Sequence, residues 1–279
     1  MTTVQDLKTP ATNTWCPGCG NFGILVALQQ AIVEMGWEQH EVLIVAGIGC
    51  SGHICNYVNT YVFEGLHGRP VPVAIGAKLA NPNLHVIVMA GDGDTYGEGL
   101  NHFINGIRGN HDVTMIVHNN GLYALTTGQS SPASDKGFKS PSTPAGLIEP
   151  ALNPLALALT QNGSFVARTA AFDMKQQKEV FMQAFKHKGF SFVEVMQHCV
   201  TFNHVKSLAF LREHVKPITG HDVKNRAAAL QLALSHELYT GVFLDDERRK
   251  SYSEEIGSLV VAGPTSEPIQ ISDLMDSMK

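Results

Sequence analysis

Five short apolar runs, with helical stretches between several of them, constrain the fold of this chain more than any other feature. The runs cover residues 41–46, 84–90, 112–118, 164–169 and 190–196. Runs of this length that are apolar nearly throughout are typical of parallel strands buried on both faces. Strands that alternate with helices form a parallel sheet with helices packed on both of its faces. We therefore expect an α/β fold with a mostly parallel sheet.

The rest of the chain indicates one core with an extension rather than two large domains. We assign residues 1–14 to a polar N-terminal arm, residues 15–220 to the core domain and residues 221–279 to a C-terminal helix and tail. The helix of this extension is expected over about residues 221–240. Residues 128–150 are rich in Ser, Pro and Gly and are expected to form a long surface loop, of a length that is often functional.

Charge and cysteine usage exclude several classes of function. The net charge is −5, from 20 basic and 25 acidic residues, so the chain has no excess of positive charge to neutralise a phosphate backbone. Nucleic acid is therefore not an expected partner. The N-terminus lacks the pattern of a signal peptide and no apolar run approaches a membrane span, so we expect a cytoplasmic protein without a membrane partner. Five cysteines, an odd number, then favour metal or redox use over a disulfide framework.

The most informative motif is a strand–helix–strand unit over residues 84–120. Its first strand ends in GDGD at residues 91–94, its helix is expected over about residues 95–109, and its second strand ends in Asn119-Asn120. Ligands of open α/β sheets bind at the carboxyl ends of such strands, and the start of the helix offers free N–H groups to an anion. GDG or NNG alone would be an ordinary turn. Together, at the ends of successive strands, they predict a binding site.

Asp92 and Asn120 are oxygen ligands of the kind that Mg²⁺ prefers. A carboxylate, an amide oxygen and a backbone carbonyl complete an octahedral shell together with diphosphate oxygens and water. GDGD followed one strand later by NN resembles the diphosphate-binding motif of thiamine-dependent enzymes. The resemblance implies that Asp92 and Asn120 bind Mg²⁺ through their side chains and that Leu122 binds it through its carbonyl.

The cysteines allow several kinds of site when they are considered alone. Cys16 and Cys19 form C-x-x-C, Cys50 follows the first apolar run in GIGCSG, Cys199 follows the last run, and Cys55 lies close to Cys50. Four thiolates can hold a 4Fe–4S cluster without being close in sequence. The C-x-x-C pair suits zinc or a redox dithiol equally well, and scattered cysteines can be small core residues.

Seven segments, taken in order, resemble the β subunit of the 2-oxoacid:ferredoxin oxidoreductases. They are WCPGCGNFG, GIGCSG, LHGR (66–69), GAKLANP (76–82), GDGD, LTTGQSSPAS (125–134) and GFSFVEVMQHCVTFN (189–203). The resemblance covers roughly residues 14–250 and implies that the core domain, residues 15–220, is a thiamine-diphosphate-binding domain of the diphosphate type.

The resemblance also assigns ligands for the metals and the cofactor. It implies one 4Fe–4S cluster on Cys16, Cys19, Cys50 and Cys199, with Cys55 as the remaining thiol. The further cofactor-binding residues that it implies are Ile48, Gly49, Cys50, Ser51, Gly91, Gly93, Asp94 and Thr127.

The reaction implied by the resemblance is the coenzyme A-dependent oxidative decarboxylation of a 2-oxoacid, with 2-oxoglutarate favoured and pyruvate possible. Electrons would pass through the cluster to ferredoxin. In such enzymes a glutamate from a pyrimidine-binding domain activates thiamine. Because this chain shows no second α/β domain to supply that glutamate, we expect an α subunit that carries it, in a heterodimer or a pair of heterodimers.

The alternatives are a subunit of a non-oxidative thiamine-dependent decarboxylase or synthase, which leaves the cysteines unexplained, and a zinc-stabilised subunit without catalysis.

Three further residues are candidates for contact with the substrate. His67 and Arg69 could face the substrate or the diphosphate, or could only hold a turn together. Family members commonly carry lysine or arginine three residues after the cysteine of GIGC, and this chain has His53 there. His53 could therefore lie beside the substrate, or only pack under the cluster loop. Three other histidines are interpreted as ordinary strand or turn residues: His85, His111 and His118.

Overall fold

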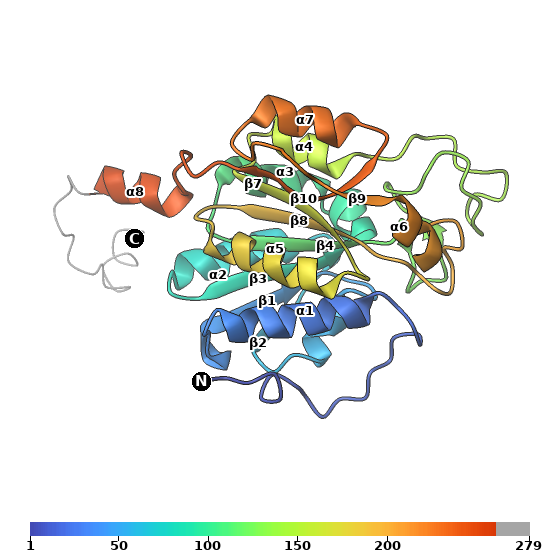
Figure 1. Ribbon diagram of the computed structural model, residues 1–279. Coiled ribbons are helices and arrows are strands. Elements are labelled where there is room, and N and C mark those ends of the chain that lie inside the picture. Colours follow the sequence, from blue (N-terminus) through green and yellow to red (C-terminus); the bar gives the residue numbers. More distant parts are fainter. Residues whose placement is uncertain (261–279) are drawn as a thin grey trace, which may run out of the picture.

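The computed structural model describes residues 1–260, and its centre is one eight-stranded sheet. The strands of the sheet are β1 (Val42–Ala46), β2 (Tyr61–Glu64), β3 (His85–Gly91), β4 (Thr114–Asn119), β7 (Phe165–Ala170), β8 (Ser191–Met196), β9 (Val215–Pro217) and β10 (Leu238–Asp245). Their order is β2-β1-β3-β4-β8-β7-β10-β9 (Figure 1). Only the β7–β10 pair of this sheet is antiparallel. The predicted mostly parallel sheet is confirmed. Strands β5 (Leu122–Tyr123) and β6 (Gln129–Ser130) form a separate two-stranded ribbon.

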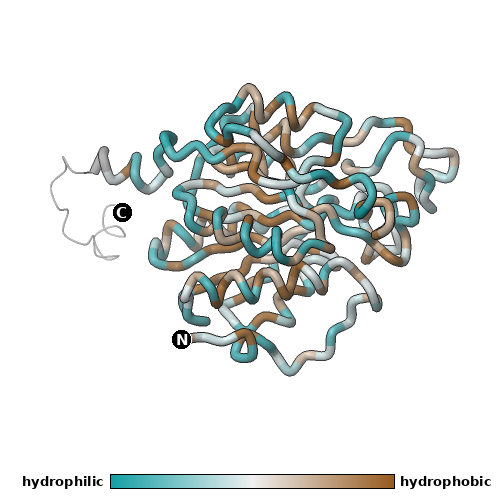
Figure 2. Tube along the Cα trace, in the orientation of Figure 1, coloured by the Kyte–Doolittle hydropathy of each residue, from teal (hydrophilic) through white to brown (hydrophobic). Residues whose placement is uncertain are grey.

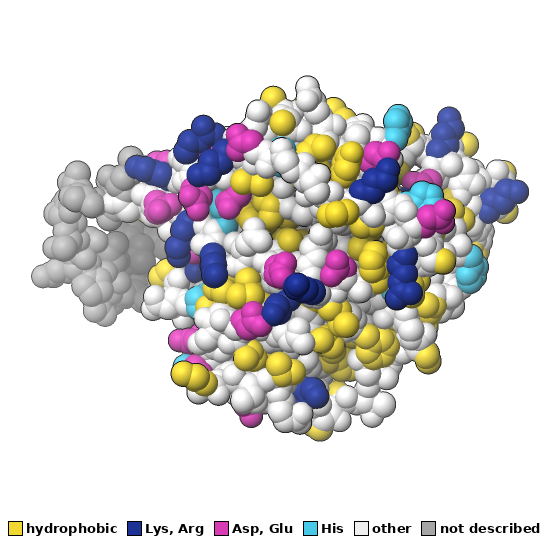
Figure 3. Space-filling view, in the orientation of Figure 1, with side chains coloured by type: hydrophobic (Ala, Val, Ile, Leu, Met, Phe, Trp, Pro, Cys, Tyr) yellow, Lys and Arg dark blue, Asp and Glu magenta, His cyan; other side chains and the backbone are white. Residues whose placement is uncertain are grey.

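Helices pack on both faces of the sheet, as the sequence predicts. Helices α1 and α5 pack on one face, and α2, α3, α4 and α7 on the other. Figure 2 shows apolar segments along the strands and polar segments in outer loops, and Figure 3 shows acidic and basic side chains interspersed on one face of the molecule. The α-helices are α1 (Asn21–Glu34), α2 (Pro70–Ala80), α3 (Leu100–Gly109), α4 (Pro154–Thr160), α5 (Met174–Lys186), α6 (Leu208–His214), α7 (Arg226–Leu234) and α8 (Tyr252–Val260). None of the helices within residues 1–260 has the length and apolarity needed to cross a membrane.

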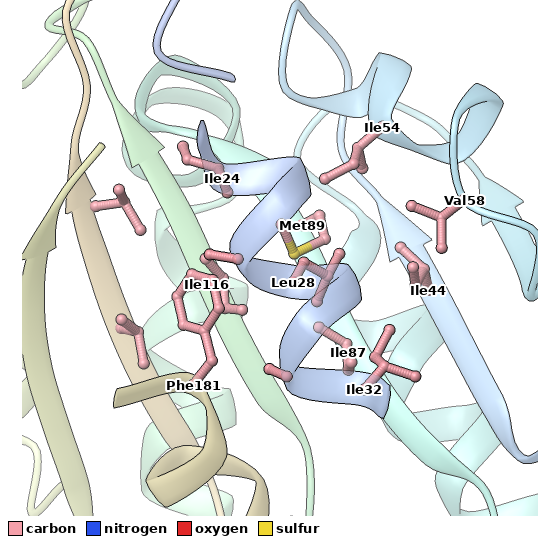
Figure 4. Close-up of a cluster of buried hydrophobic side chains, with 14 of the residues drawn as sticks. Ile24, Leu28, Ile32, Ile44, Ile54, Val58, Ile87, Met89, Ile116 and Phe181 are labelled. Carbon is pink, nitrogen blue, oxygen red and sulfur yellow. The ribbon is translucent and has the colours of Figure 1, made fainter. Parts of the chain in front are cut away.

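Helix α1 shows how the sequence pattern builds the core. Ile24, Leu28 and Ile32 recur every four residues, lie on one face of the helix and are fully buried (Figure 4). They belong to the same core cluster as Ile44 of β1 and Ile116 of β4. Each such side chain contributes ~1.5–3 kcal/mol when it leaves water. The helix is thereby held against the strands whose carboxyl ends carry the predicted site.

Two of the predicted helices differ from those observed. The helical segment already begins within GDGD, as a π-helix over Gly93–Glu98, and α3 starts only at Leu100. The helix predicted over about residues 221–240 covers only Arg226–Leu234, because Ser235 is extended and the chain continues into β10. That prediction was therefore wrong for residues 221–225, which are irregular or in a turn, and for residues 235–240, which run into β10 of the main sheet.

The predicted arm and loop have anchored parts. In the arm, Leu7 is fully buried and its carbonyl accepts a hydrogen bond of 3.2 Å from Gln29 Nε2, so the arm is not loose there. The segment at residues 128–150 is largely irregular, as predicted, but Ser131 and Ser134 within it are buried. The predicted polar tail falls partly on residues 261–279, which lie outside the described residues.

Candidate active site

The candidate site lies at the carboxyl ends of four adjacent parallel strands, β1, β3, β4 and β8. Cys50 follows β1, Asp92 follows β3, Asn120 follows β4 and Cys199 follows β8. Residues from four separate parts of the sequence are therefore brought to one edge of the sheet, the edge where ligands of α/β proteins bind.

One pocket at this edge contains almost all of the predicted cofactor-binding residues. Thr127 is the exception: it is exposed, has a left-handed backbone with φ of 79°, and the pocket is lined by its neighbour Thr126 instead. The lining consists of Ile48, Gly49, Cys50, Ser51, His67, Gly91, Asp92, Gly93, Asp94, His118, Asn120, Leu122, Tyr123, Ala124, Leu125, Thr126 and Gln197.

Asp92 lines this pocket and is only 1% exposed. One of its oxygens accepts a hydrogen bond of 3.3 Å from the Asn120 backbone N–H, and the other accepts one from the Ser131 hydroxyl. Burial nevertheless raises the pKa of the Asp92 carboxyl to about 7, because the charged form loses its water. A cation in the pocket would offset that cost, so the residue suits a metal ion.

The turn that follows β4 is held from both sides. Asn120 Oδ1 accepts a hydrogen bond of 3.0 Å from the Leu122 backbone N–H, and the Asn120 carbonyl accepts one of 2.8 Å from Asn203 Nδ2. Two of the three predicted metal ligands, Asn120 and the Leu122 carbonyl, thus belong to one turn beside Asp92.

Asp94 ties three segments of the site together. Its Oδ1 accepts hydrogen bonds from the backbone N–H groups of Ile48, at 3.0 Å, and Gly68, at 2.9 Å. The same oxygen lies 2.8 Å from His67 Nδ1, so His67 is directed at the pocket. A side chain at Gly47 would collide with this carboxylate, which explains the glycine there. Burial raises the pKa of the Asp94 carboxyl.

Arg69 lies outside this arrangement. It is exposed, its guanidinium Nη1 lies 2.6 Å from His102 Nε2, and neither residue lines the pocket. Of the three catalytic candidates, His67 lines the cofactor pocket, His53 lines the neighbouring thiol cavity, and Arg69 lines neither.

His118 also lines the pocket, and its interpretation as an ordinary strand residue missed this position. Its Nδ1 lies 2.8 Å from Asn21 Oδ1, an acceptor, so Nδ1 carries the proton and Nε2 keeps a lone pair. Asn21 Nδ2 bonds the Cys50 carbonyl at 3.3 Å, which fixes the amide in this orientation. Burial lowers the pKa of His118 to about 3, so the imidazole is neutral. The signal in the sequence was its position directly before Asn119-Asn120.

A second cavity, of about 290 Å³, is lined by four of the five cysteines. They are Cys16, Cys19, Cys50 and Cys199. Cys55 is buried elsewhere, with its thiol 4.0 Å from the Ile44 carbonyl, and burial raises its pKa to about 12. The structure therefore separates the same four thiols from the fifth as the family resemblance does. Within residues 1–260, no three His, Cys, Asp or Glu side chains are placed to hold a single metal ion.

The four thiols lie close enough to influence one another. Burial, followed by the charges of the other three cysteines, raises the pKa of Cys50 to about 11. Gln197 Nε2 donates to Cys19 Sγ at 3.4 Å, and the Thr201 hydroxyl donates to Cys16 Sγ at 3.2 Å. Such donors favour thiolates, and bound iron would offset their mutual repulsion.

The cofactor pocket and the thiol cavity share one wall. Five residues line both: Cys50, Asn120, Ala124, Leu125 and Gln197. A group bound at the GDGD motif and a group bound by the thiols would therefore be neighbours.

Comparison with known proteins agrees with this geometry. Residues 47–195 match the family "Thiamine pyrophosphate enzyme, C-terminal TPP binding domain", and residues 199–260 match the C-terminal family of the "Pyruvate ferredoxin oxidoreductase beta subunit". The 2-oxoacid:ferredoxin oxidoreductase subunit beta of Saccharolobus solfataricus is 42% identical over 260 residues, which cover 88% of this chain and 85% of that one. The 2-oxoglutarate synthase subunit KorB of Archaeoglobus fulgidus is 40% identical over 202 residues, covering 72% and 75%.

A solved structure is similar over the whole chain. The 2-oxoglutarate:ferredoxin oxidoreductase from Magnetococcus marinus, with 2-oxoglutarate, coenzyme A and succinyl-CoA bound, superposes with a TM-score of 0.93 at 32% identity. The match covers 100% of this chain and 96% of the other. Family models, relatives and fold agree, and this chain belongs to the 2-oxoacid:ferredoxin oxidoreductase β-subunit family.

Proposed function

We propose that this β subunit holds Mg²⁺–thiamine diphosphate in the GDGD pocket and a 4Fe–4S cluster in the thiol cavity. With an α subunit it would catalyse coenzyme A-dependent oxidative decarboxylation of a 2-oxoacid and pass the electrons to ferredoxin. The observation that carries the proposal is the shared wall, because decarboxylation and electron removal require the two groups to be neighbours.

The pocket residues suit a diphosphate and its metal. Asp92, Asn120 and the Leu122 carbonyl would hold Mg²⁺. The metal ion would supply the positive charge that balances the buried Asp92 carboxylate. Ser51 Oγ and His118 Nε2 line the pocket, are buried, and have no hydrogen-bond partner in the described part of the chain. Buried polar atoms are normally satisfied, so these two are available to a ligand. When bound, thiamine diphosphate supplies the electron sink for decarboxylation.

The thiol cavity suits an iron–sulfur cluster. Cys16, Cys19, Cys50 and Cys199 would each supply one thiolate. Gln197 and Thr201 donate hydrogen bonds to two of these sulfurs, and such donors tune the potential of a bound cluster. When bound, the cluster accepts electrons one at a time. Cys50 lines both the cofactor pocket and the thiol cavity, so this residue joins the two halves of the site.

2-Oxoglutarate is the favoured substrate. The A. fulgidus relative is named a 2-oxoglutarate synthase subunit, and the M. marinus enzyme holds 2-oxoglutarate. His53 lines the thiol cavity and is half-buried, with Nδ1 3.4 Å from Asn56 Nδ2. An imidazole can give the distal carboxylate of 2-oxoglutarate a hydrogen bond, but it lacks the permanent positive charge of a lysine or arginine. Selectivity over pyruvate should therefore be relaxed.

Replacing His53 with lysine should sharpen that selectivity. A charged contact to the distal carboxylate is worth roughly 1.5–3 kcal/mol, so the ratio of kcat/KM for 2-oxoglutarate to kcat/KM for pyruvate should rise about tenfold or more. The exposed His40→Lys variant controls for the added charge. Steady-state kinetics of the assembled complex measure both ratios, and an unchanged ratio in His53→Lys would place this residue outside the substrate pocket.

The isolated chain should be unable to catalyse the oxidation of a 2-oxoacid. The strands described in residues 1–260 belong to one main sheet and one two-stranded ribbon, and we propose that the domain that supplies the activating glutamate comes from the α subunit. The β subunit reconstituted with cluster, Mg²⁺ and thiamine diphosphate should not reduce ferredoxin when given a 2-oxoacid and coenzyme A, and adding the α subunit should restore the reaction. Full turnover by the β subunit alone would contradict the proposal.

A further inference from the structure

Two neighbouring strands, β7 and β8, carry a buried ion pair that lies outside the cofactor pocket. Arg168 of β7 and Glu194 of β8 are in register, and Arg168 Nε lies 2.6 Å from Glu194 Oε2. Their side chains are 12% and 2% exposed. The guanidinium also lies 5.9 Å from the ring centre of Phe243 on β10, so the antiparallel strand supports it. Buried ion pairs add little stability on average, since their desolvation is costly. This pair therefore calls for a role other than stability.

The second oxygen of Glu194 reaches toward the site. Glu194 Oε1 accepts a hydrogen bond of 2.7 Å from Asn119 Nδ2, and Asn119 Oδ1 accepts one of 3.0 Å from the Gly121 backbone N–H. Gly121 has φ of 70°, a left-handed turn conformation. An unbroken series of hydrogen bonds thus runs from Arg168, through Glu194 and Asn119, into the turn after β4.

That turn carries two of the proposed Mg²⁺ ligands. Asn120 and Leu122 lie on either side of Gly121, and the Asn120 N–H donates to Asp92 at 3.3 Å. The Asn119 side chain is fixed at both ends, by Glu194 and by Gly121. Without the Glu194 contact, the amide of Asn119 would be free to rotate and the turn would lose one of its fixed hydrogen bonds.

We propose that Glu194 is a positioning residue that acts through Asn119 on the metal-binding turn, and that Arg168 compensates the buried charge of Glu194. The proposal rests on the proposed function, since it takes Asn120 and Leu122 as Mg²⁺ ligands. Arg168 and Glu194 line a separate cavity of about 350 Å³ rather than the cofactor pocket, so they act on the cofactor only indirectly. Residues that orient metal ligands typically change metal affinity ~10–100-fold when replaced.

Two double variants separate this role from a purely structural one. Arg168→Met with Glu194→Gln removes the ion pair without leaving an unpaired charge, and the glutamine oxygen still accepts from Asn119. Arg168→Met with Glu194→Leu removes the ion pair and the acceptor together. We expect the first variant to bind thiamine diphosphate with nearly the affinity of the unmodified complex, and the second to bind it ~10–100-fold more weakly.

The measurement is a titration of the assembled complex with thiamine diphosphate at fixed Mg²⁺, with iron content and Tm recorded for each variant. Asn119→Ala keeps the ion pair and should also weaken the binding of thiamine diphosphate. It tests the same contact if the variant with Glu194→Leu does not fold. Asp112→Asn removes an ion pair with Lys78 (3.3 Å) near the opposite end of β4 and should bind normally. Equal affinities in the two double variants would overturn the positioning role.

Asp92→Ala in the same titration distinguishes failure of the positioning role from failure of the proposed metal site. If Asp92→Ala binds weakly while the leucine variant and Asn119→Ala bind normally, the positioning role is overturned and the metal site stands. If Asp92→Ala itself binds normally, the metal site is overturned, and the positioning role fails with it.

Discussion

The Asp92→Ala complex should lose tight binding of Mg²⁺–thiamine diphosphate and keep its iron–sulfur cluster. Asp92 is 1% exposed and is the only carboxylate among the three proposed Mg²⁺ ligands, the others being Asn120 and the Leu122 carbonyl. Its removal leaves the diphosphate charge poorly neutralised inside a buried pocket. Because residues that only orient ligands cost ~10–100-fold, loss of a charged ligand should reduce affinity by more than about 100-fold.

Calorimetric titration with thiamine diphosphate at fixed Mg²⁺ measures this loss. Iron content serves as the internal control, since Asp92 does not line the thiol cavity. Ser131→Ala is a matched control for the pocket: it removes only the hydroxyl that donates to Asp92, and the metal ligands stay in place. Its loss of affinity should be clearly smaller. A normal titration of Asp92→Ala would show that the GDGD pocket is not the diphosphate site.

Loss of iron from cysteine variants is the second large expected effect. Cys16→Ser and Cys199→Ser should each lose the cluster, because a serine hydroxyl is a poor substitute for a soft thiolate ligand. Cys55→Ser should keep it, since the Cys55 thiol is directed at the Ile44 carbonyl and is separated from the cavity. The Cys55 variant is thus a control of the same chemistry at a different place in the fold.

Iron and acid-labile sulfide analysis and the electron paramagnetic resonance of the reduced complex distinguish the variants. Cluster-free variants should still bind thiamine diphosphate but should not reduce ferredoxin. An intact cluster in Cys199→Ser together with a lost cluster in Cys55→Ser would mean that the fourth ligand is misassigned.

Buried strands of the sheet could be predicted from the sequence because their signal is local. The run at residues 190–196 became β8 (Ser191–Met196), and the run at residues 41–46 became β1 (Val42–Ala46). Strand β10 was missed because it contains Gly241, with φ of 132°, and alternates only weakly in burial. It forms against β7, a partner distant in sequence, and a local pattern carries no information about such a partner.

For the site, too, residues with a local sequence signal could be predicted, and residues that depend on distant contacts could not. Asp92 and Asn120 could be found because each directly follows a strand, and parallel strands bring such ends together. The roles of Asp94 and Glu194 could not, since Asp94 contacts Ile48 and Gly68 from other loops, and Glu194 of β8 reaches Asn119 on the neighbouring strand β4. Contacts of this kind appear only when the chain is folded.

The most direct test of the account is chemical analysis of the assembled complex after anaerobic purification. A 4Fe–4S cluster in the thiol cavity predicts about four iron and about four sulfide per β subunit. Bound cofactor in the GDGD pocket predicts about one thiamine diphosphate per β subunit, in keeping with the thiamine-binding family that residues 47–195 match. Zinc in place of iron and sulfide, or a folded complex that retains no thiamine diphosphate when the cofactor and Mg²⁺ are supplied, would contradict it.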